Sequence, residues 1–421
     1  MSLNILLVNP NTYKHPPVIP IGLEYLSTAL EKHGYSADFL DLCFTESPVN
    51  ELNKKLEEKS YDIVGFTIRN IDSALYFNNE FFIPPFRELT QCVKKHGITV
   101  VLGGSGFSAM PLEILEYLNA DYGIIGPGEI IFPRFLKEFQ SKQALKKIYD
   151  GWESVTDPEL IHLRGKRFNY AQYIAEDGIV GIQTHVGCPN SCPYCIEANT
   201  KVSFKKIPNI IEEMEHLINQ GYSHFHTCDS EFNCNLNYSI KFCKALIEKE
   251  LDLKWALYMK PYPYSEELFQ LLHESNANLI TLSVDSDKRI QASNNYSYED
   301  VAKIIELCKK YEIEIAIDVL TGYPSESLES TKEMIAFFKK NIPKTVGVTF
   351  IYRVLKNTSL AKLIKENISL QKYLMKPYNK EEKFLEPNFY TQYEIEIIEE
   401  LIKNDDLFQI AGKMLGVNYQ L

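Results

Sequence analysis

Three cysteines within eight residues constrain this 421-residue chain more than any other feature. Cys188, Cys192 and Cys195 are spaced C-x3-C-x2-C and follow an apolar run, Ile179 to Val186, that predicts a strand. The thiols are therefore expected on the loop at the carboxyl end of that strand. Three thiolates can hold three irons of a four-iron cluster and leave the fourth iron open to a small molecule.

A structural zinc site is the alternative interpretation of the clustered thiols. Such sites are normally closed by four ligands, often carried on C-x2-C pairs. No second pair of that kind follows, although Cys228 or Cys234 offers a fourth thiol.

The cysteine loop resembles that of the radical S-adenosylmethionine (SAM) superfamily, in which an aromatic residue, here Tyr194, precedes the last cysteine. The resemblance extends over roughly residues 179–360. It implies that Cys188, Cys192 and Cys195 hold a [4Fe-4S] cluster whose open iron binds SAM. It also implies reductive cleavage of SAM to methionine and a 5′-deoxyadenosyl radical, with Tyr194 packed on the adenine.

The length predicts two domains, and the composition predicts a cytoplasmic protein. Lys+Arg 44 against Asp+Glu 56 gives a net charge of −12, which disfavours a nucleic-acid partner. No stretch approaches 18 uninterrupted apolar residues, so no membrane span is expected. The start, MSLNILLVNPN, lacks the basic flank and apolar core of a signal peptide. Nine cysteines without regular spacing fit reduced thiols in a cytosol.

The N-terminal part alternates between short apolar runs and amphipathic segments. This alternation predicts a parallel, doubly wound sheet of Rossmann or flavodoxin-like type. The expected strands are Asn4–Asn9, Ala37–Leu42, Tyr61–Thr67, Thr99–Leu102 and Tyr122–Ile125, and the expected helices are Gly22–His33, Val49–Lys59, Pro84–His96, Pro111–Leu118 and Ile131–Gln140.

Doubly wound sheets bind ligands beyond the carboxyl ends of their strands, and glycines there let the backbone approach a bulky ligand. The loops VNPN, DIVGFT, VLGGSG and GPGE resemble those of the cobalamin (B12)-binding domain that precedes many radical SAM domains. The resemblance covers roughly residues 3–140. It implies cobalamin contacts at Asn9, Asn11, Thr67, Arg69, Gly103, Gly104, Ser105, Gly126, Gly128 and Glu129.

The chain departs from one B12-binding pattern. Domains that supply a histidine to cobalt carry D-x-H-x-x-G after the first strand, and here Tyr13 stands where the aspartate belongs, two residues before His15. We interpret His15 as a loop residue, so that cobalt would have water or nothing as its lower ligand.

After the cysteine loop, strand and helix alternate again. The six expected strand–helix units fit the partial (β/α)6 barrel, of TIM type, that the radical SAM resemblance implies, with its chemistry at the carboxyl strand ends. The strands after the cysteine-bearing run are His224–Cys228, Trp255–Lys260, Leu279–Asp285, Ile313–Leu320 and Val346–Val354.

Polar residues at those ends are the candidates for holding SAM. Glu231, in the segment DSEFN, stands where the family holds the SAM amino group, although Asp229 or Ser230 could instead cap a helix. The candidates for binding SAM are Tyr194, Asp229, Glu231, Lys260, Ser283, Asp285 and Asp318. The family's Gly-x-Pro turn beside the adenine resembles TGYP, residues 321–324.

We expect a cobalamin-binding domain at residues 1–142, a linker at 143–175, a radical SAM partial barrel at 176–368 and a C-terminal helical cap at 369–421. Within the cap, amphipathic patterns predict helices at Glu394–Lys403 and Asp406–Met414.

Taken together, the resemblances imply an enzyme that binds a [4Fe-4S] cluster, SAM and cobalamin. They imply methylation of an unactivated carbon (or phosphorus) of a small-molecule or peptide substrate, with electrons from a donor such as flavodoxin or ferredoxin. The same cofactors used for ring closure or rearrangement are the first alternative, and a non-catalytic cobalamin or iron–sulfur sensor is the second. A tRNA methylthiotransferase would need three further cluster cysteines in its N-terminal part, where this chain has only Cys43 and Cys92.

Overall fold

The structure, a computed structural model, describes residues 3–75, 77–153 and 157–411. Contacts between residues group the chain into two compact units. The first unit comprises Met1–Ser73, Asn79–Val180 and Ser203–Gln220, and the second comprises Ala74–Asn78, Gly181–Val202 and Gly221–Leu421. No helix in the described ranges is long and apolar enough to cross a membrane.

The first unit is built on a parallel sheet of six strands in the order β2-β1-β3-β4-β5-β6. β1 is buried at all five positions, as expected for a central strand covered on both faces. The order changes direction between β1 and β3, which makes their carboxyl ends the switch point where such sheets bind ligands. The strands are β1 Ile5–Asn9, β2 Ala37–Asp41, β3 Ile63–Thr67, β4 Thr99–Gly103, β5 Tyr122–Ile125 and β6 Ile148–Asp150.

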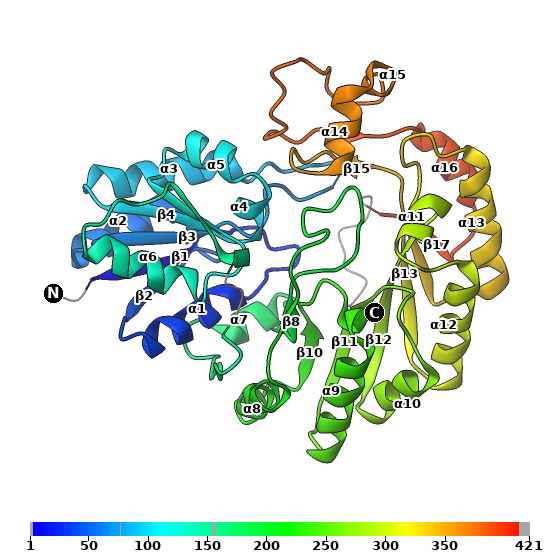
Figure 1. Cartoon of the computed structure of the whole chain (residues 1–421), viewed down its shortest axis with the longest axis horizontal. Coiled ribbons are helices and arrows are strands. Elements are labelled where there is room, and N and C mark those ends of the chain that lie inside the picture. Colours follow the sequence, from blue (N-terminus) through cyan, green and yellow to red (C-terminus); the bar gives the residue numbers. More distant parts are fainter. Residues whose placement is uncertain (1–2, 76, 154–156, 412–421) are drawn as a thin grey trace. The chain divides into compact units, whose positions relative to one another are not determined.

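Helices cover both faces of this sheet. Figure 1 shows α3 and α5 on one side of it and α1 and α6 on the other. α6 buries Phe132, Phe135 and Leu136, three or four residues apart, on one helical stripe. The helices are α1 Ile21–Lys32, α2 Pro48–Glu58, α3 Ile83–Lys95, α4 Ser105–Ala109, α5 Pro111–Leu118, α6 Ile131–Gln140, α7 Tyr170–Ala175 and α8 Ile207–Ile218, with a 3-10 turn, η1, at Gly151–Glu153.

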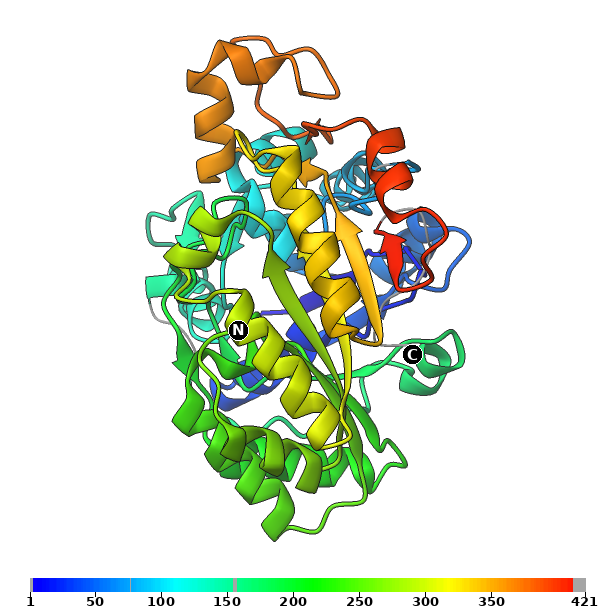
Figure 2. The same cartoon turned by 90° about the vertical axis from the view of Figure 1, so that its right-hand side faces the viewer.

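The second unit carries a sheet of seven strands in the order β17-β14-β13-β12-β11-β10-β7. The strands from β10 to β14 are parallel and follow chain order, as in an incomplete barrel. Figure 2 shows the helices that connect them lying along the strands. The strands are β7 Val180–Ile182, β10 His224–Thr227, β11 Lys254–Met259, β12 Ala277–Asp285, β13 Glu314–Leu320, β14 Thr345–Thr349 and β17 Phe408–Ile410.

Short elements complete the chain. The helices of the second unit are α9 Leu236–Glu248, α10 Glu266–Glu274, α11 Lys288–Ser293, α12 Tyr298–Lys310, α13 Leu328–Asn341, α14 Ser359–Glu366, α15 Ile368–Gln371 and α16 Ile395–Ile402, with a 3-10 turn, η2, at Phe232–Cys234. The remaining strands, of two residues each, are β8 His185–Val186, β9 Ser203–Phe204, β15 Tyr352–Arg353 and β16 Phe389–Tyr390.

Both predicted fold classes are confirmed, but several predicted elements are wrong. The helix predicted at Asp406–Met414 is instead the strand β17, which pairs with β14 through Val346 and Phe408; residues 412–414 lie outside the described ranges. The single strand predicted at Val346–Val354 ends at Thr349, because Tyr352 and Arg353 turn away to pair with β16. β17 and β16 are fixed by partners far away in the chain, which local patterns do not register.

Two further differences concern the segments before the cysteine loop. The run Ile179 to Val186 is divided into β7 and β8. The stretch between Gln140 and Ala175, for which the sequence predicts no regular element, contains β6, which pairs with β5. Strands of two or three residues are too short to give a periodic pattern.

Candidate cofactor-binding sites

The cysteine loop leaves the second sheet through β7 and β8 and is held closed by backbone hydrogen bonds. The Cys195 N–H donates to the Cys192 carbonyl at 3.1 Å, which turns the loop between the last two thiols. Thr200 holds the backbone of Cys188 in place, because its hydroxyl accepts from the Cys188 N–H at 2.9 Å and its own N–H donates to the Cys188 carbonyl. The loop is therefore shaped by its own backbone.

The three thiols form one electrostatic group. Burial, together with Glu231, Cys195 and Cys192, raises the pKa of Cys188 to about 12. Burial likewise raises the pKa of Cys195 to about 11. Among the described residues, no three His, Cys, Asp or Glu side chains converge on one point as the ligands of a single metal ion would. Three soft sulfur donors on one loop fit an iron–sulfur cluster, which spreads its ligands over several irons.

Asp285, at the end of β12, connects two of the other predicted SAM residues, Tyr194 and Lys260. One carboxylate oxygen accepts from the Tyr194 hydroxyl at 2.5 Å, and the other accepts from Lys260 Nζ at 3.1 Å and from the Tyr296 hydroxyl at 3.0 Å. Asp285 is 1% exposed and Lys260 is buried with it. Burial alone would lower the pKa of Lys260, but Asp285, together with Tyr296, Cys192 and Glu231, outweighs burial and raises that pKa well above its usual value.

Glu231 and Asp229 lie in one loop but have different surroundings. Glu231 is 7% exposed, and its Oε2 has no hydrogen-bond partner among the described residues. Burial raises the pKa of Glu231 to about 8, against the lowering effect of Lys260. Asp229 instead accepts from the N–H groups of Thr184 and His185 and from the Thr184 hydroxyl. The contacts of Asp229 thus order the strand before the cysteine loop, whereas Glu231 retains an acceptor for a ligand.

Ser283 and Asp318 are neighbours in the register of β12 and β13. Asp285 lies two residues beyond Ser283, so the three side chains share one face of the sheet. The TGYP turn is fixed by Glu326, whose carboxylate accepts from the N–H groups of Gly322 and Tyr323.

Two residues near the thiols, Asn294 and His185, were not predicted from the sequence. Asn294 reaches the loop from the end of α11: its Oδ1 accepts from the Ser191 N–H at 3.0 Å, and its Nδ2 lies 3.8 Å from the Cys192 sulfur. His185 lies beside Cys234, with 3.3 Å between Nε2 and the sulfur. Neither residue belongs to a spaced motif, and Asn294 lies about a hundred residues from the cysteines, so no local signal identifies them.

In the first unit, the carboxyl ends of β1, β3 and β4 are tied together by polar contacts. Asn11 Nδ2 donates to the Thr67 carbonyl at 3.1 Å, and Asn11 Oδ1 accepts from the Arg69 N–H at 3.2 Å. The Ser105 hydroxyl donates to the Arg69 carbonyl at 2.7 Å. Four of the predicted cobalamin residues thus lie at one edge of the sheet.

Asn9 and Glu129 face inward instead. Asn9 is buried and donates to Asp41 Oδ1 at 2.9 Å and to the Tyr173 hydroxyl at 3.1 Å. Glu129 is buried, and burial raises its pKa against the opposing effect of Lys205. The contacts of Asn9 order the loop from within, whereas Oε2 of Glu129 has no hydrogen-bond partner among the described residues. His15 is exposed, as expected of a loop residue.

The predicted glycines fall into two kinds. A Cβ at Gly104, which has φ +99°, would lie 2.4 Å from the Ile68 carbonyl oxygen, and one at Gly126 would meet Trp152. Gly103 and Gly128 have room, since a Cβ there would meet its nearest atom at 3.8 and 3.5 Å. Internal packing therefore requires glycine at Gly104 and Gly126 but not at Gly103 and Gly128. The space beside Gly103 and Gly128 would let a corrin ring approach the backbone of these loops.

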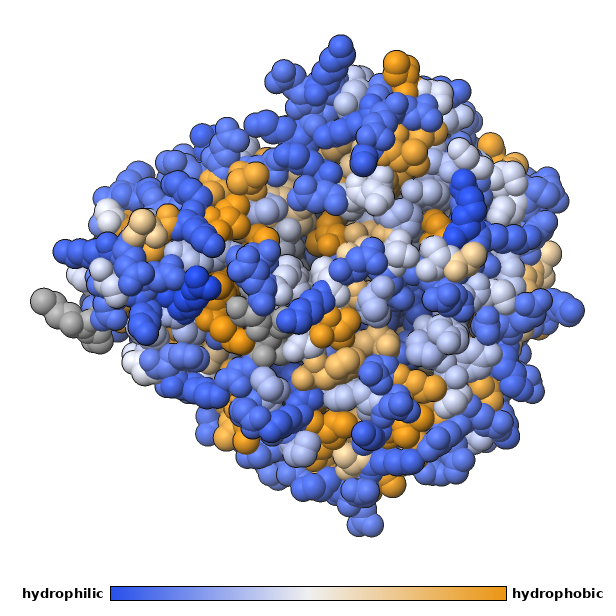
Figure 3. All heavy atoms as spheres, viewed as in Figure 1, coloured by the Kyte–Doolittle hydropathy of each residue, from blue (hydrophilic) through white to orange (hydrophobic). Residues whose placement is uncertain are grey.

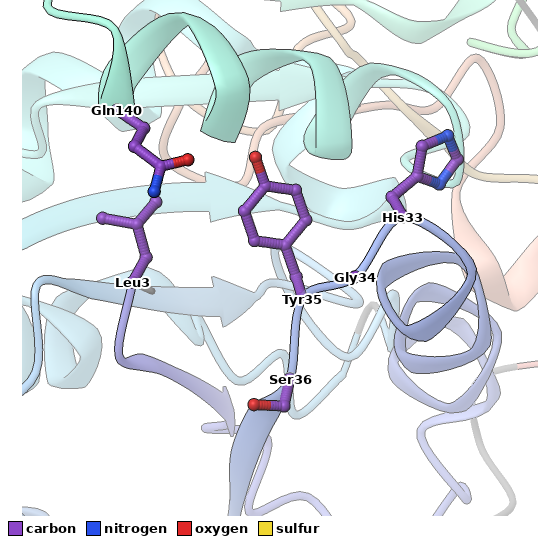
Figure 4. A pocket seen from close by; sticks show the side chains of 6 residues that line it. All are labelled: Leu3, His33, Gly34, Tyr35, Ser36 and Gln140. Atoms are coloured by element: carbon purple, nitrogen blue, oxygen red, sulfur yellow. The ribbon is translucent and has the colours of Figure 1, made fainter. Parts of the chain in front are cut away.

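A pocket of about 220 Å³ lies at the amino ends of the strands of the first sheet (Figure 4). Leu3 precedes β1, and Tyr35 and Ser36 precede β2, so this pocket lies at the amino ends of the strands. It is separate from the loops that carry the predicted cobalamin residues.

Comparison with protein families matches both halves of the chain. Residues 15–136 match the B12 binding domain, and residues 182–338 match the radical SAM superfamily. The chain therefore carries a B12-binding domain followed by a radical SAM domain. The first implies cobalamin, and the second implies a [4Fe-4S] cluster and SAM.

More particularly, the chain is homologous to cobalamin-dependent radical SAM methyltransferases. It is 23% identical to tryptophan 2-C-methyltransferase of Streptomyces laurentii, over 86% of this chain and 74% of the relative. It is 23% identical to bacteriochlorophyllide d C-8(2)-methyltransferase of Chlorobaculum tepidum, over 67% of this chain and 63% of the relative. It shares its fold with TsrM of Kitasatospora setae, a structure with cobalamin and a [4Fe-4S] cluster bound, at a TM-score of 0.88 and 23% identity over 97% of this chain and 93% of the other.

Proposed function

We propose that this protein is a cobalamin-dependent radical SAM methyltransferase that methylates an unactivated carbon (or phosphorus) of a small-molecule or peptide substrate. The observation that carries the proposal is the grouping of three coupled thiols with a buried, charged set of side chains in a chain that also contains a B12-binding domain. When bound, cobalamin and SAM supply the methyl group and the radical that activates the substrate.

In this proposal the chain's own residues bind and orient the cofactors. Cys188, Cys192 and Cys195 hold the cluster. The unpartnered oxygen of Glu231 accepts a hydrogen bond from the amino group of SAM, which would also offset the cost of burying that carboxylate. Lys260 and Asp285 hold each other in place at the carboxyl ends of β11 and β12. Ser283 and Asp318 lie on the same face of the sheet as Asp285.

The B12-binding domain has its own part in the proposal. Asn11, Thr67, Arg69 and Ser105 hold the loops at the carboxyl edge of the first sheet in place. The room at Gly103 and Gly128 admits the corrin ring. Asn9 supports these loops from beneath, and Glu129 retains a buried carboxylate oxygen with no partner among the described residues.

Anaerobic reconstitution with iron, sulfide and hydroxocobalamin tests the proposal. After desalting, we expect near-stoichiometric corrin and four irons per chain, and both 5′-deoxyadenosine and S-adenosylhomocysteine once SAM and reductant are added. Cys192→Ala should lose the cluster and both products, whereas Cys228→Ala, at an exposed cysteine near the loop, should keep them.

Other outcomes would identify the alternatives. Corrin with 5′-deoxyadenosine alone would favour a rearrangement or ring closure over methylation. Retention of a full cluster by Cys192→Ala would contradict the assignment of the thiols. Bound cofactors without any cleavage of SAM would point to a sensor.

A further inference from the structure

A basic segment stands out in this acidic chain. Residues 356–383, which we call the lysine segment, contain seven lysines and three glutamates, a formal charge of +4. The whole chain carries −12. A local reversal of charge sign on a surface attracts partners of the opposite sign.

The lysine segment begins beside the cysteine loop. α14 starts there with Thr358 as its N-cap, and the Leu360 N–H in its first turn donates to the Pro193 carbonyl at 2.8 Å. Pro193 lies between Cys192 and Cys195. Because an α-helix rises about 1.5 Å per residue, Lys362 is only about 3 Å further along the helix than Leu360. Figure 1 shows α14 and α15 together at one end of the second unit.

Five of the seven lysines in the lysine segment are exposed. They are Lys362, Lys372, Lys376, Lys380 and Lys383. Lys362 and Lys380 form no ion pair with any residue that the structure describes. Lys376 pairs with Glu386 at 3.2 Å, and Lys372 lies over the ring of Tyr373.

Apolar side chains lie among these lysines. Ile368 is 83% exposed and Met375 is 49% exposed. Figure 3 shows hydrophobic atoms surrounded by hydrophilic ones over the region of α14 and α15. Apolar contacts within a polar rim are the usual anatomy of a protein–protein interface.

The far end of the lysine segment is fixed to the fold. The Arg353 guanidinium donates to the carbonyls of Val354, Phe384 and Leu385. The Asn388 side chain accepts from the Lys376 N–H at 3.0 Å and donates to the Lys376 carbonyl. A surface held at both ends loses little conformational freedom when a partner binds.

We propose that the lysine segment is the docking surface for an acidic one-electron carrier protein of the flavodoxin or ferredoxin type. The inference rests on the proposed function, because it needs a cluster at Cys188, Cys192 and Cys195. The carrier is oxidised by one electron, the oxidised cluster is reduced by one electron, and no covalent bond forms between the proteins. The hydrogen bond from Leu360 to Pro193 brings the bound carrier close to the cluster, and short distances speed electron transfer.

Charge reversal of Lys362 and Lys380 tests the proposal. An acidic flavodoxin is the probe, and its Kd for the reconstituted protein is measured at low and high salt. We expect Lys362→Glu/Lys380→Glu to raise the Kd roughly tenfold and to weaken its salt dependence, since charges at an interface rim steer association. The rate of cluster reduction by flavodoxin hydroquinone should fall in parallel, whereas reduction by dithionite should not change.

Lys241→Glu/Lys254→Glu is the matched control. Both residues are exposed, and Lys254 begins β11, at the strand end opposite the cysteine loop. An unchanged Kd for the first variant, or an equal loss in the control, would overturn the proposal. Salt-sensitive binding to phosphatidylglycerol vesicles in place of flavodoxin, or self-association through the lysine segment, would also overturn it. A protein that holds no iron but still binds flavodoxin through these lysines would count against the proposed function and not against the docking surface.

Discussion

At the level of single residues, the carboxylates of the second unit have two different roles. Some are hydrogen-bonded within the fold, and one keeps an oxygen for a ligand. Asp285 is fully engaged by Tyr194, Lys260 and Tyr296, and Asp229 by Thr184 and His185. Of the four carboxylates predicted to bind SAM, Glu231 alone has a buried oxygen with no partner among the described residues. Because burying an unpaired polar atom is costly, Glu231 is the one among these carboxylates that retains an acceptor for a ligand.

Glu231→Gln should weaken SAM binding while leaving the cluster in place. A hydrogen bond between charged groups contributes about 1.5–3 kcal/mol, so the Kd for SAM should rise roughly tenfold to a hundredfold. Equilibrium dialysis of the reconstituted protein measures the Kd, and iron content reports the cluster. Glu274→Gln, at an exposed residue in the last turn of α10, is the control. Wild-type affinity in Glu231→Gln would rule out the contact.

The sequence identified some of these residues and not others for a physical reason. The cysteines stand out by local spacing, and Lys260 and Asp285 by their positions at strand ends. Tyr296 and Asn294 lie in the α11–α12 region and meet the site only because β12 and the cysteine loop fold against it. Which carboxylate is satisfied and which is not depends on neighbours that are remote in sequence.

At the level of elements, the turn from β4 into α4 combines two adjacent glycines with different roles. Gly104 adopts φ +99° and lies against the Ile68 backbone, so the fold itself demands glycine. Gly103 has ordinary space for a side chain. These two roles cannot be distinguished from the Gly-Gly sequence alone.

Replacing the two glycines should separate stability from cobalamin binding. Gly104→Ala should lower the free energy of unfolding by about 1–3 kcal/mol because of its strained backbone conformation and the clash. Gly103→Ala should change that free energy by less than about 0.5 kcal/mol and still reduce the hydroxocobalamin retained after desalting. Chemical denaturation and the corrin absorption are the two measurements. Full retention of corrin by a well-folded Gly103→Ala would place the ring elsewhere.

At the level of the whole molecule, each unit has its own parallel sheet, and the first unit also buries a charged cluster. Arg164 pairs with Glu213 of α8, and Tyr25 of α1 donates to the same carboxylate at 3.0 Å. His162 is 2% exposed beside the ring of Tyr25, and neither of its ring nitrogens has a partner among the described residues. Breaking such a buried set affects the stability of the unit that contains it.

His162 should make the first unit sensitive to acid. Burial, helped by Lys205, Arg164 and Arg167, lowers its pKa from 6.5 to about 2. The unfolded chain therefore binds more protons than the folded one between these values, so the contribution of His162 is complete above about pH 6.5 and is lost as the pH falls. The free energy of unfolding should therefore fall by up to about 1.4 kcal/mol for each pH unit below this value.

Denaturation curves between about pH 5 and 7 test this expectation. His162→Phe, which keeps a ring beside Tyr25, should remove most of that slope, whereas His273→Phe, at an exposed position, should keep it. Equal slopes in the wild type and His162→Phe would show that His162 does not govern the acid response.

The sequence by itself determined the cysteine motif, the alternation that makes both sheets parallel and the loops that resemble a B12-binding domain, because each of these is a local pattern of spacing or periodicity. Only the tertiary structure decided that Asn9, Asp229 and Glu129 face inward, that β17 joins the second sheet and that α14 bonds to the cysteine loop. Those features depend on which distant segments pack together. Burial and hydrogen-bond partners, unlike spacing, exist only once the chain has folded.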